Sequence, residues 1–150
     1  MRIDDEGLIC VRGPSVAPDE AGPDGWLQTR DLGRLDEEGY LYVLGRADDV
    51  IVTGGKKVAP DEVEQVLLAH PDVADAAVYP RADPEWQQAV VAAVVPADGM
   101  RLDEAELRAF CRERLAPHKV PKEFTPVAKV PRNSQGKVLR ATFSPDPPPD

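Results

Sequence analysis

The pattern of apolar residues changes near residues 45–49, and this change limits the possible folds more than any other feature of the sequence. The first 44 residues hold short strand-like runs separated by stretches rich in glycine, proline and aspartate. Asp36-Glu37-Glu38-Gly39 lies between two such runs and predicts a hairpin turn. The apolar residues among the first 44 positions are too few to form a separate core, so we expect this segment to be the edge of a larger domain. The predicted strands are Leu8–Val11, Trp26–Thr29 and Tyr40–Leu44.

The rest of the chain has the pattern of a small α+β domain. A β-branched run at residues 50–52 is followed by a helix that opens at Pro60, with acids in its first turn, and ends at His70-Pro71. Two strand-like runs, a second helix capped by Asp103 and a last strand near residues 124–127 follow. One face of the second helix carries Leu107, Phe110, Cys111 and Leu115, and we expect Cys111 to pack in the core.

The resulting order, β-α-β-β-α-β, is the split βαβ arrangement of an α+β domain. We therefore predict this domain over residues 48–143 and a β segment over residues 1–47. The proline-rich stretch 144–150 is predicted to be a disordered tail.

Composition excludes several classes of protein. The net charge of −9 argues against a nucleic-acid partner, and no apolar run is long enough to predict a membrane span. The first ten residues do not have the pattern of a signal peptide. Cys10 and Cys111 form no metal-binding or disulfide pattern, so we predict no metal ligands and a cytoplasmic location.

Three features are candidates for chemistry, and each has a plain structural alternative. Residues 112–140 contain eight Lys or Arg residues and two acids, which suits a polyphosphate ligand or simply a solvated surface. Gly54-Gly55-Lys56-Lys57, between a strand and a helix, is a close-approach loop or an ordinary turn. Asn133–Lys137 is a polar loop whose lysine either enters a site as a point charge or is merely solvated. His70 and His118 are interpreted as structural, and Trp86 either as a packing residue or as part of a ligand path.

Together these stretches resemble a known family. Residues 25–36, GWLQTRDLGRLD, resemble the ribose-binding motif of the AMP-forming adenylating enzymes, which include acyl- and aryl-CoA synthetases. Residues 45–64 resemble the hinge motif of that family, and residues 131–138, PRNSQGKV, resemble its catalytic-lysine motif. Arg30 stands where the family usually has glycine. Some o-succinylbenzoate–CoA ligases share the Thr-Arg-Asp pattern, which suggests a role in menaquinone biosynthesis.

The resemblance implies roles for individual residues. Lys137 would be the catalytic lysine of adenylation, and Asp48 would be the hinge about which the small domain rotates. Asp31 would accept hydrogen bonds from the ribose hydroxyls, and Arg46 would support nucleotide binding. The face that forms the thioester site with CoA would comprise Gly54, Gly55, Lys56 and Lys57.

The resemblance also implies partners. ATP with Mg²⁺ would be bound mainly by a large N-terminal domain, CoA would be the co-substrate, and a small carboxylic acid would be the substrate. The family's phosphate-binding loop lies outside these 150 residues, so we expect the chain alone to be inactive. Two alternatives stay open: a fragment of a carrier-loading adenylation domain, and a non-catalytic stand-alone module that binds CoA or a partner protein.

Overall fold

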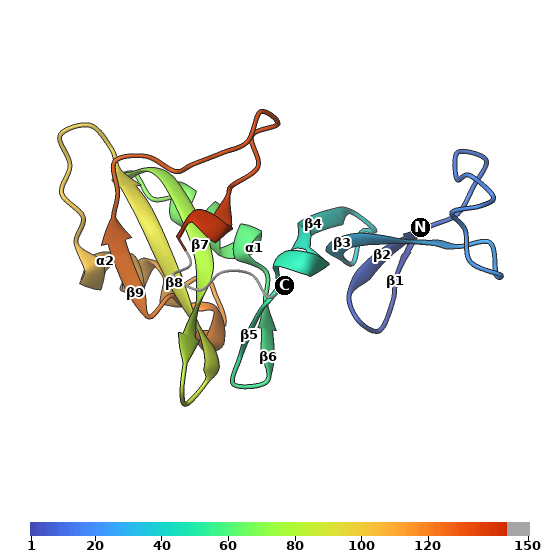
Figure 1. The fold of residues 1–150 in the computed structure, drawn as a ribbon, viewed down its shortest axis with the longest axis horizontal. Helices are drawn as coiled ribbons and strands as arrows, with labels where there is room; N and C mark the ends of the chain where they lie inside the picture. Colours follow the sequence, from blue (N-terminus) through green and yellow to red (C-terminus); the bar gives the residue numbers. More distant parts are fainter. Residues whose placement is uncertain (144–150) are drawn as a thin grey trace. The chain divides into compact units, whose positions relative to one another are not determined.

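The computed structural model describes residues 1–143, which form two compact units (Figure 1). The first unit is Met1–Val50, and the second begins at Ile51. The boundary predicted between residues 47 and 48 stays a prediction. The tail predicted over residues 144–150 lies outside the described residues.

The first unit is a four-stranded antiparallel sheet with the strands in chain order. Asp36 closes the predicted hairpin turn, because its Oδ1 accepts the backbone N–H groups of Glu38 and Tyr40 at 3.0 and 2.9 Å. Ile9 and Cys10 are the buried apolar residues of this unit. Its elements are β1 (Arg2–Ile3), β2 (Leu8–Val11), β3 (Leu27–Leu35), β4 (Leu41–Arg46) and the 3₁₀ turn η1 (Ala47–Asp49).

The second unit is a five-stranded sheet with two helices, which confirms the predicted α+β class. The central strand β8 pairs antiparallel with β7 along most of its length and parallel with β9, and it touches β5 near its first residue. The strands are β5 (Ile51–Thr53), β6 (Lys56–Val58), β7 (Val73–Asp83), β8 (Gln87–Pro96) and β9 (Glu123–Pro126). The helices are α1 (Pro60–Leu68) and α2 (Glu104–Arg112), with the 3₁₀ turns η2 (Pro117–Lys119) and η3 (Arg140–Thr142).

Strand β6 is absent from the elements expected from the sequence, and it changes the setting of the glycine pair. Gly54 and Gly55 do not lead from a strand into a helix but form the turn of the β5–β6 hairpin. Their φ angles of +57° and +78° are those that a two-residue hairpin turn requires. The sequence does not predict this strand, because Lys56 and Lys57 are polar and exposed and only Val58 among its three residues is apolar and buried.

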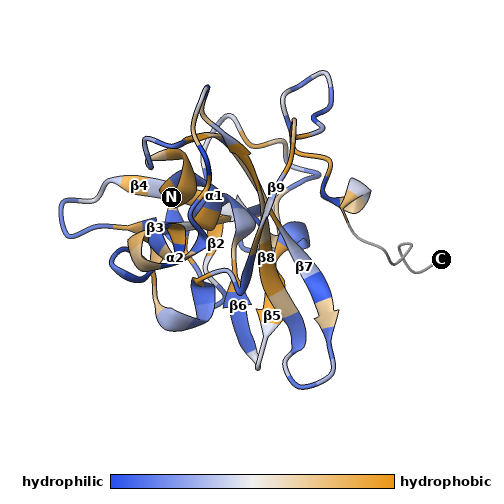
Figure 2. Ribbon diagram, turned by 90° about the vertical axis from the view of Figure 1, so that its left-hand side faces the viewer, coloured by the Kyte–Doolittle hydropathy of each residue, from blue (hydrophilic) through white to orange (hydrophobic). Residues whose placement is uncertain are grey.

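The core of the second unit lies on both faces of its sheet. One face packs against α1 and α2 through a large apolar cluster that contains Cys111, as predicted from its helix position. The other face is covered by the chain after β9, where Val130 and Val138 pack on Ala77 and Ala93. Strand β8 is accordingly apolar along most of its length (Figure 2). Among residues 1–143, no helix is both long enough and apolar enough to cross a bilayer.

Candidate functional site

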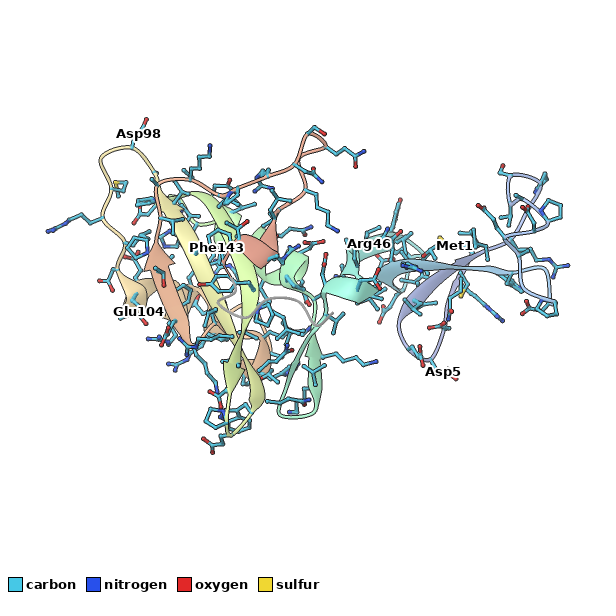
Figure 3. All side chains as sticks on the ribbon, in the orientation of Figure 1. Met1, Asp5, Arg46, Asp98, Glu104 and Phe143 are labelled. Atoms are coloured by element: carbon cyan, nitrogen blue, oxygen red, sulfur yellow. The ribbon has the colours of Figure 1, made fainter. Side chains whose placement is uncertain are left out.

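Strands β3 and β4 bring together the two residues predicted to bind the nucleotide. Asp31 and Arg46 are direct partners in the β3–β4 register, and Arg46 Nη1 lies 3.1 Å from Asp31 Oδ1. Arg46 is at the end of β4 (Figure 3). Thr29 fixes the strand beside them, since its hydroxyl donates to the Ile9 carbonyl and accepts the Asp31 N–H. The arrangement presents a half-exposed carboxylate held by a guanidinium, which suits vicinal hydroxyls.

The predicted hinge residue lies just before the boundary between the two units. Asp48 is the middle residue of η1, two residues before Val50 closes the first unit. Its carboxylate forms an ion pair with Arg30, whose Nη1 lies 3.4 Å from Asp48 Oδ2. Arg30 is the residue that departs from the family pattern, and in this structure its partner is the predicted hinge.

The loop of Lys137 is closed by its own hydrogen bonds. Asn133 organises it: its backbone N–H donates to the Lys137 carbonyl at 2.9 Å, and its Oδ1 accepts the Gln135 and Lys137 N–H groups. An isolated bridge between Arg132 and Val138 closes the base of the loop. Lys137 is therefore an exposed residue on a tight turn whose base is packed on the sheet.

Gly54 makes close contact with Trp86. The Gly54 N–H donates to the Trp86 carbonyl at 2.9 Å, and a Cβ at Gly54 would lie 2.6 Å from the indole ring. A side chain at Gly55 would meet open space. Gly54 thus joins the β5–β6 turn to the β7–β8 turn, where Trp86 lies.

A pocket of about 950 Å³ opens beside this contact. Its apolar lining includes Trp86, and four of its residues are cationic. The Lys122 ammonium lies 4.7 Å from the centre of the Trp86 ring. Arg108 is held in place by Glu104 at 2.6 Å and by the Lys122 carbonyl at 2.9 Å. The lining residues are Thr53, Gly54, Lys56, Trp86, Val90, Arg108, Arg112, Leu115, Pro117, His118, Val120, Pro121 and Lys122.

The electrostatics of the pocket favour an anionic ligand. Burial, and then the charges of Lys56 and Lys119, lower the pKa of His118, so positive charge already lies beside this residue of the pocket. Cations beside an aromatic and apolar lining suit a ligand with phosphates at one end and an organic body. Of the four residues predicted for the CoA face, Gly54 and Lys56 line this pocket; Gly55 and Lys57 are not among its lining residues.

The pocket and the Lys137 loop lie at opposite ends of one sheet. The loop is tied to Asp75 at the start of β7 through Arg132, whereas Trp86 follows Asp83, the last residue of that strand. Eight steps along a strand, at about 3.3 Å each, place these ends about 26 Å apart. In Figure 1 the loop between β9 and η3 lies at the top of this unit and the β5–β6 turn lies at the bottom.

One group of residues has the composition of a metal site. Among residues 1–143, His70, Asp72 and Glu106 bring ligand atoms within 4.8 Å of one another. Both ring nitrogens of His70 are already engaged: Nδ1 accepts the Asp72 N–H at 3.1 Å, and Nε2 faces Glu106 at 3.5 Å. His70 also packs edge-on against Phe110. We interpret these three residues as a structural contact that connects the end of α1 to α2.

Sequence patterns identify only part of the pocket. Arg112 and Lys122 belong to the cationic stretch at residues 112–140, and a ligand path is one of the two interpretations of Trp86. Arg108 and His118 are lining residues that no sequence pattern assigns to a site. Their spacing alone carries no motif, because the pocket forms only when α2, η2 and the β7–β8 turn come together.

The chain belongs to the family of the AMP-binding enzyme C-terminal domain, whose model matches residues 62–137. It is 45% identical over 144 residues to the 2-succinylbenzoate–CoA ligase of Bacillus mycoides (strain KBAB4), covering 90% of this chain and 30% of the relative. It is 48% identical over 143 residues to the ligase of the same name from Geobacillus kaustophilus (strain HTA426), covering 89% and 29%.

A solved structure shows the same fold. The o-succinylbenzoate CoA synthetase (MenE) of Bacillus subtilis, in complex with the acyl-adenylate intermediate OSB-AMP, matches with a TM-score of 0.80 and 39% identity. The match covers 94% of this chain and 30% of that chain. The chain therefore spans about 30% of the length of these relatives, and its fold is that of the adenylate-forming C-terminal domain.

Proposed function

We propose that this chain is the C-terminal part of an ATP-dependent, AMP-forming acid–CoA ligase, with 2-succinylbenzoate as the leading candidate acid. The overall reaction has two steps. A carboxylate attacks the α-phosphorus of ATP to give an acyl-adenylate and pyrophosphate; the CoA thiol then displaces AMP to give the thioester. The observation that carries the proposal is that one small sheet holds the Lys137 loop at one end and the cation-lined pocket at the other.

In the first step, Lys137 supplies positive charge where negative charge gathers. Carboxylate and triphosphate are both anions, so their approach and the pentavalent phosphorus between them need a cation. Lys137 is exposed on a closed turn, where it can enter a site as a point charge. Asp31, held by Arg46, binds the ribose hydroxyls.

In the second step, the small domain rotates about Asp48 and presents its other end. The pocket beside Gly54 then receives CoA: the cations face its phosphates, and Trp86 with the apolar lining faces its organic part. A single hinge thereby uses both ends of the sheet in turn.

We assign Mg²⁺ and most contacts with ATP to a large N-terminal domain, which is also the principal protein partner. The one metal-like group of the described residues is occupied by internal contacts and lies outside the proposed sites. A cytoplasmic location fits the two buried free thiols, Cys10 and Cys111.

The pocket also bears on the two alternatives. A carrier-loading domain receives a pantetheine arm without the nucleotide part of CoA, so it has less use for four cations around one pocket. A stand-alone CoA-binding module would use the pocket but would have no use for an exposed lysine on a closed turn.

A hybrid enzyme tests the proposal. This chain replaces the matching 143 residues of the Geobacillus kaustophilus ligase, and both half-reactions are measured with 2-succinylbenzoate, ATP and CoA. We expect the hybrid to form the adenylate and the thioester. A hybrid that unfolds cooperatively but forms neither product, beside an active parent enzyme, would overturn the proposal. Thioester formation from supplied acyl-adenylate and CoA, with no adenylation of 2-succinylbenzoate by ATP, would favour the stand-alone CoA module.

A further inference from the structure

Two arginines flank Lys137 and fasten its loop to the rest of the domain. Arg132 lies five residues before the lysine and Arg140 three residues after it. Both contact acids on other elements. The base of the loop is therefore held on both sides by charge as well as by apolar packing.

The first fastening is a forked contact with β7. Arg132 Nη2 lies 2.6 Å from Asp75 Oδ1, and its Nε lies 3.4 Å from Oδ2 of the same carboxylate. Its Nη1 turns back and donates to the Gly136 carbonyl at 3.0 Å. One guanidinium thus connects the strand with the residue immediately before Lys137.

The second fastening is more deeply buried. The Arg140 side chain is 11% exposed, and its Nη2 contacts Asp61 at 2.6 Å and Glu64 at 2.8 Å on α1. Its Nε donates to the Val78 carbonyl at 2.9 Å, while Glu64 Oε1 accepts the Val78 N–H at 2.9 Å. Helix α1, strand β7 and the end of the loop are joined in one network.

Apolar packing continues the second fastening. Phe143 directly follows η3 (Figure 3). It stacks on Tyr79 of β7, with ring centres 5.1 Å apart. Val78 and Tyr79 are neighbours in β7, and the chain after Lys137 contacts both of them, through Arg140 and Phe143 respectively. This end of the loop has little freedom to move relative to the sheet.

We propose that Arg132 and Arg140 are positioning residues that set where the Lys137 ammonium stands when the domain is in its adenylating orientation. The proposal rests on the function proposed for Lys137. A lysine acting on a pentavalent phosphorus must be placed to within a fraction of an ångström, and its own turn fixes only the local backbone. The two arginines supply the second constraint, that of the turn relative to the sheet.

The test compares charge-removing variants in the hybrid enzyme. The variants are Arg132→Gln and Arg140→Gln, with Asp75→Asn and Glu64→Gln as partner substitutions that keep the side-chain shape. Arg81→Gln is the matched control, because Arg81 pairs with Glu123 on the same sheet but away from the loop. For each variant, the adenylation rate and the thioester rate from supplied acyl-adenylate are measured.

We expect both arginine variants to slow adenylation at saturating ATP and acid by about ten- to a hundredfold, with the KM values changed less than about threefold. Thioester formation should stay within about threefold of the parent, because that step uses the other end of the sheet. Amide exchange should quicken at residues 133–137 in the arginine variants and not in the Arg81 control.

Three outcomes would overturn the inference. One is an equal loss in both half-reactions by the arginine variants, which would mean a general folding role. Another is adenylation unchanged in all four variants. If Arg140→Gln fails to fold, unchanged adenylation in Glu64→Gln and Asp75→Asn overturns the inference in the same way. Lys137→Ala in the same hybrid separates the two proposals: if it keeps full adenylation, the proposed function fails rather than the positioning role.

Discussion

The guanidinium of Arg30 lies 3.4 Å from the carboxylate of Asp48, so the ribose-motif strand is tied to the predicted hinge residue. Both side chains are mostly exposed, at 74% and 62%. An exposed pair of this kind contributes about 0.2–1 kcal/mol and is screened by salt. The pair can therefore bias the hinge only slightly.

Removing this pair should shift the balance between the two half-reactions by a small factor. In the hybrid enzyme, Arg30→Gly and Asp48→Asn should each change the ratio of adenylation to thioester rates by no more than about fivefold. The double variant should change this ratio by less than the sum of the two single effects. Salt at about 1 M should abolish the difference between the variants and the parent enzyme. A hundredfold change, or one insensitive to salt, would show that Arg30 acts through something other than this ion pair.

The two glycines of the β5–β6 turn should differ in their tolerance of alanine. Both have positive φ angles, but only Gly54 would place a Cβ 2.6 Å from the Trp86 ring. Gly54→Ala should therefore lower the free energy of unfolding by about 1–3 kcal/mol more than Gly55→Ala does. Urea unfolding of both variants, followed by circular dichroism, checks this. Equal losses would mean that Trp86 moves aside freely.

Glu64 should make the second unit less stable as the pH rises from about 5 to about 8, whereas His118, whose pKa is lowered, acts in the opposite direction. Burial raises the pKa of Glu64 from 4.5 to about 7, and Asp61 adds to the shift, against the Val78 N–H and Arg140, which lower it. A carboxyl whose pKa is raised in the folded state binds its proton more tightly there. Its contribution to stability is therefore present at low pH and is lost through about pH 7.

The size of this effect follows from the shift. Glu64 should contribute about 2–3 kcal/mol to the free energy of unfolding near pH 5 that is gone near pH 8. Urea unfolding at the two pH values measures it, and Glu64→Gln should remove most of the difference. A wild-type chain whose stability rises over this range, with the same slope in Glu64→Gln, would contradict the assignment.

The proposed role of the pocket in CoA binding can be tested by substituting one lysine inside it and one lysine outside it. Lys122 lies over Trp86 in the pocket lining, whereas Lys129 is exposed and is not a lining residue. In the hybrid, Lys122→Ala should raise the KM for CoA by about five- to tenfold, because a charged contact with phosphate is lost. It should leave adenylation unchanged, and Lys129→Ala should change neither. Equal KM values for the two variants would remove the pocket from the CoA site.

Local patterns predict most of the fold. The helix beginning at Pro60, the Asp103 cap and the burial of Cys111 depend on neighbouring residues, and all three are confirmed. Strand β6 escapes such prediction because Lys56 and Lys57 are exposed. Its existence depends on pairing with β5, which no local propensity encodes.

The site is predictable only where motifs lie close together in the sequence. The sequence marks the turn that brings β3 beside β4, but the direct pairing of Asp31 with Arg46 also depends on the register shift between Leu32 and Gly33, which no sequence pattern predicts. The pocket combines Arg108, Trp86 and Lys56, which lie far apart in the chain and meet only after folding. The contact between Arg140 and Glu64 likewise spans 76 residues.

The measurement that tests the central claim most directly is the pair of half-reaction rates for Lys137→Ala in the hybrid enzyme. Loss of one preorganised charge from a transition state typically costs about 2.7–4 kcal/mol, or roughly 10²–10³ in rate. Adenylation should fall by that factor, while CoA transfer from supplied acyl-adenylate should remain nearly intact. Lys56→Ala, at the other end of the sheet, should show the opposite bias. Equal loss of both half-reactions in Lys137→Ala would contradict the assignment of separate steps to the two ends of this domain.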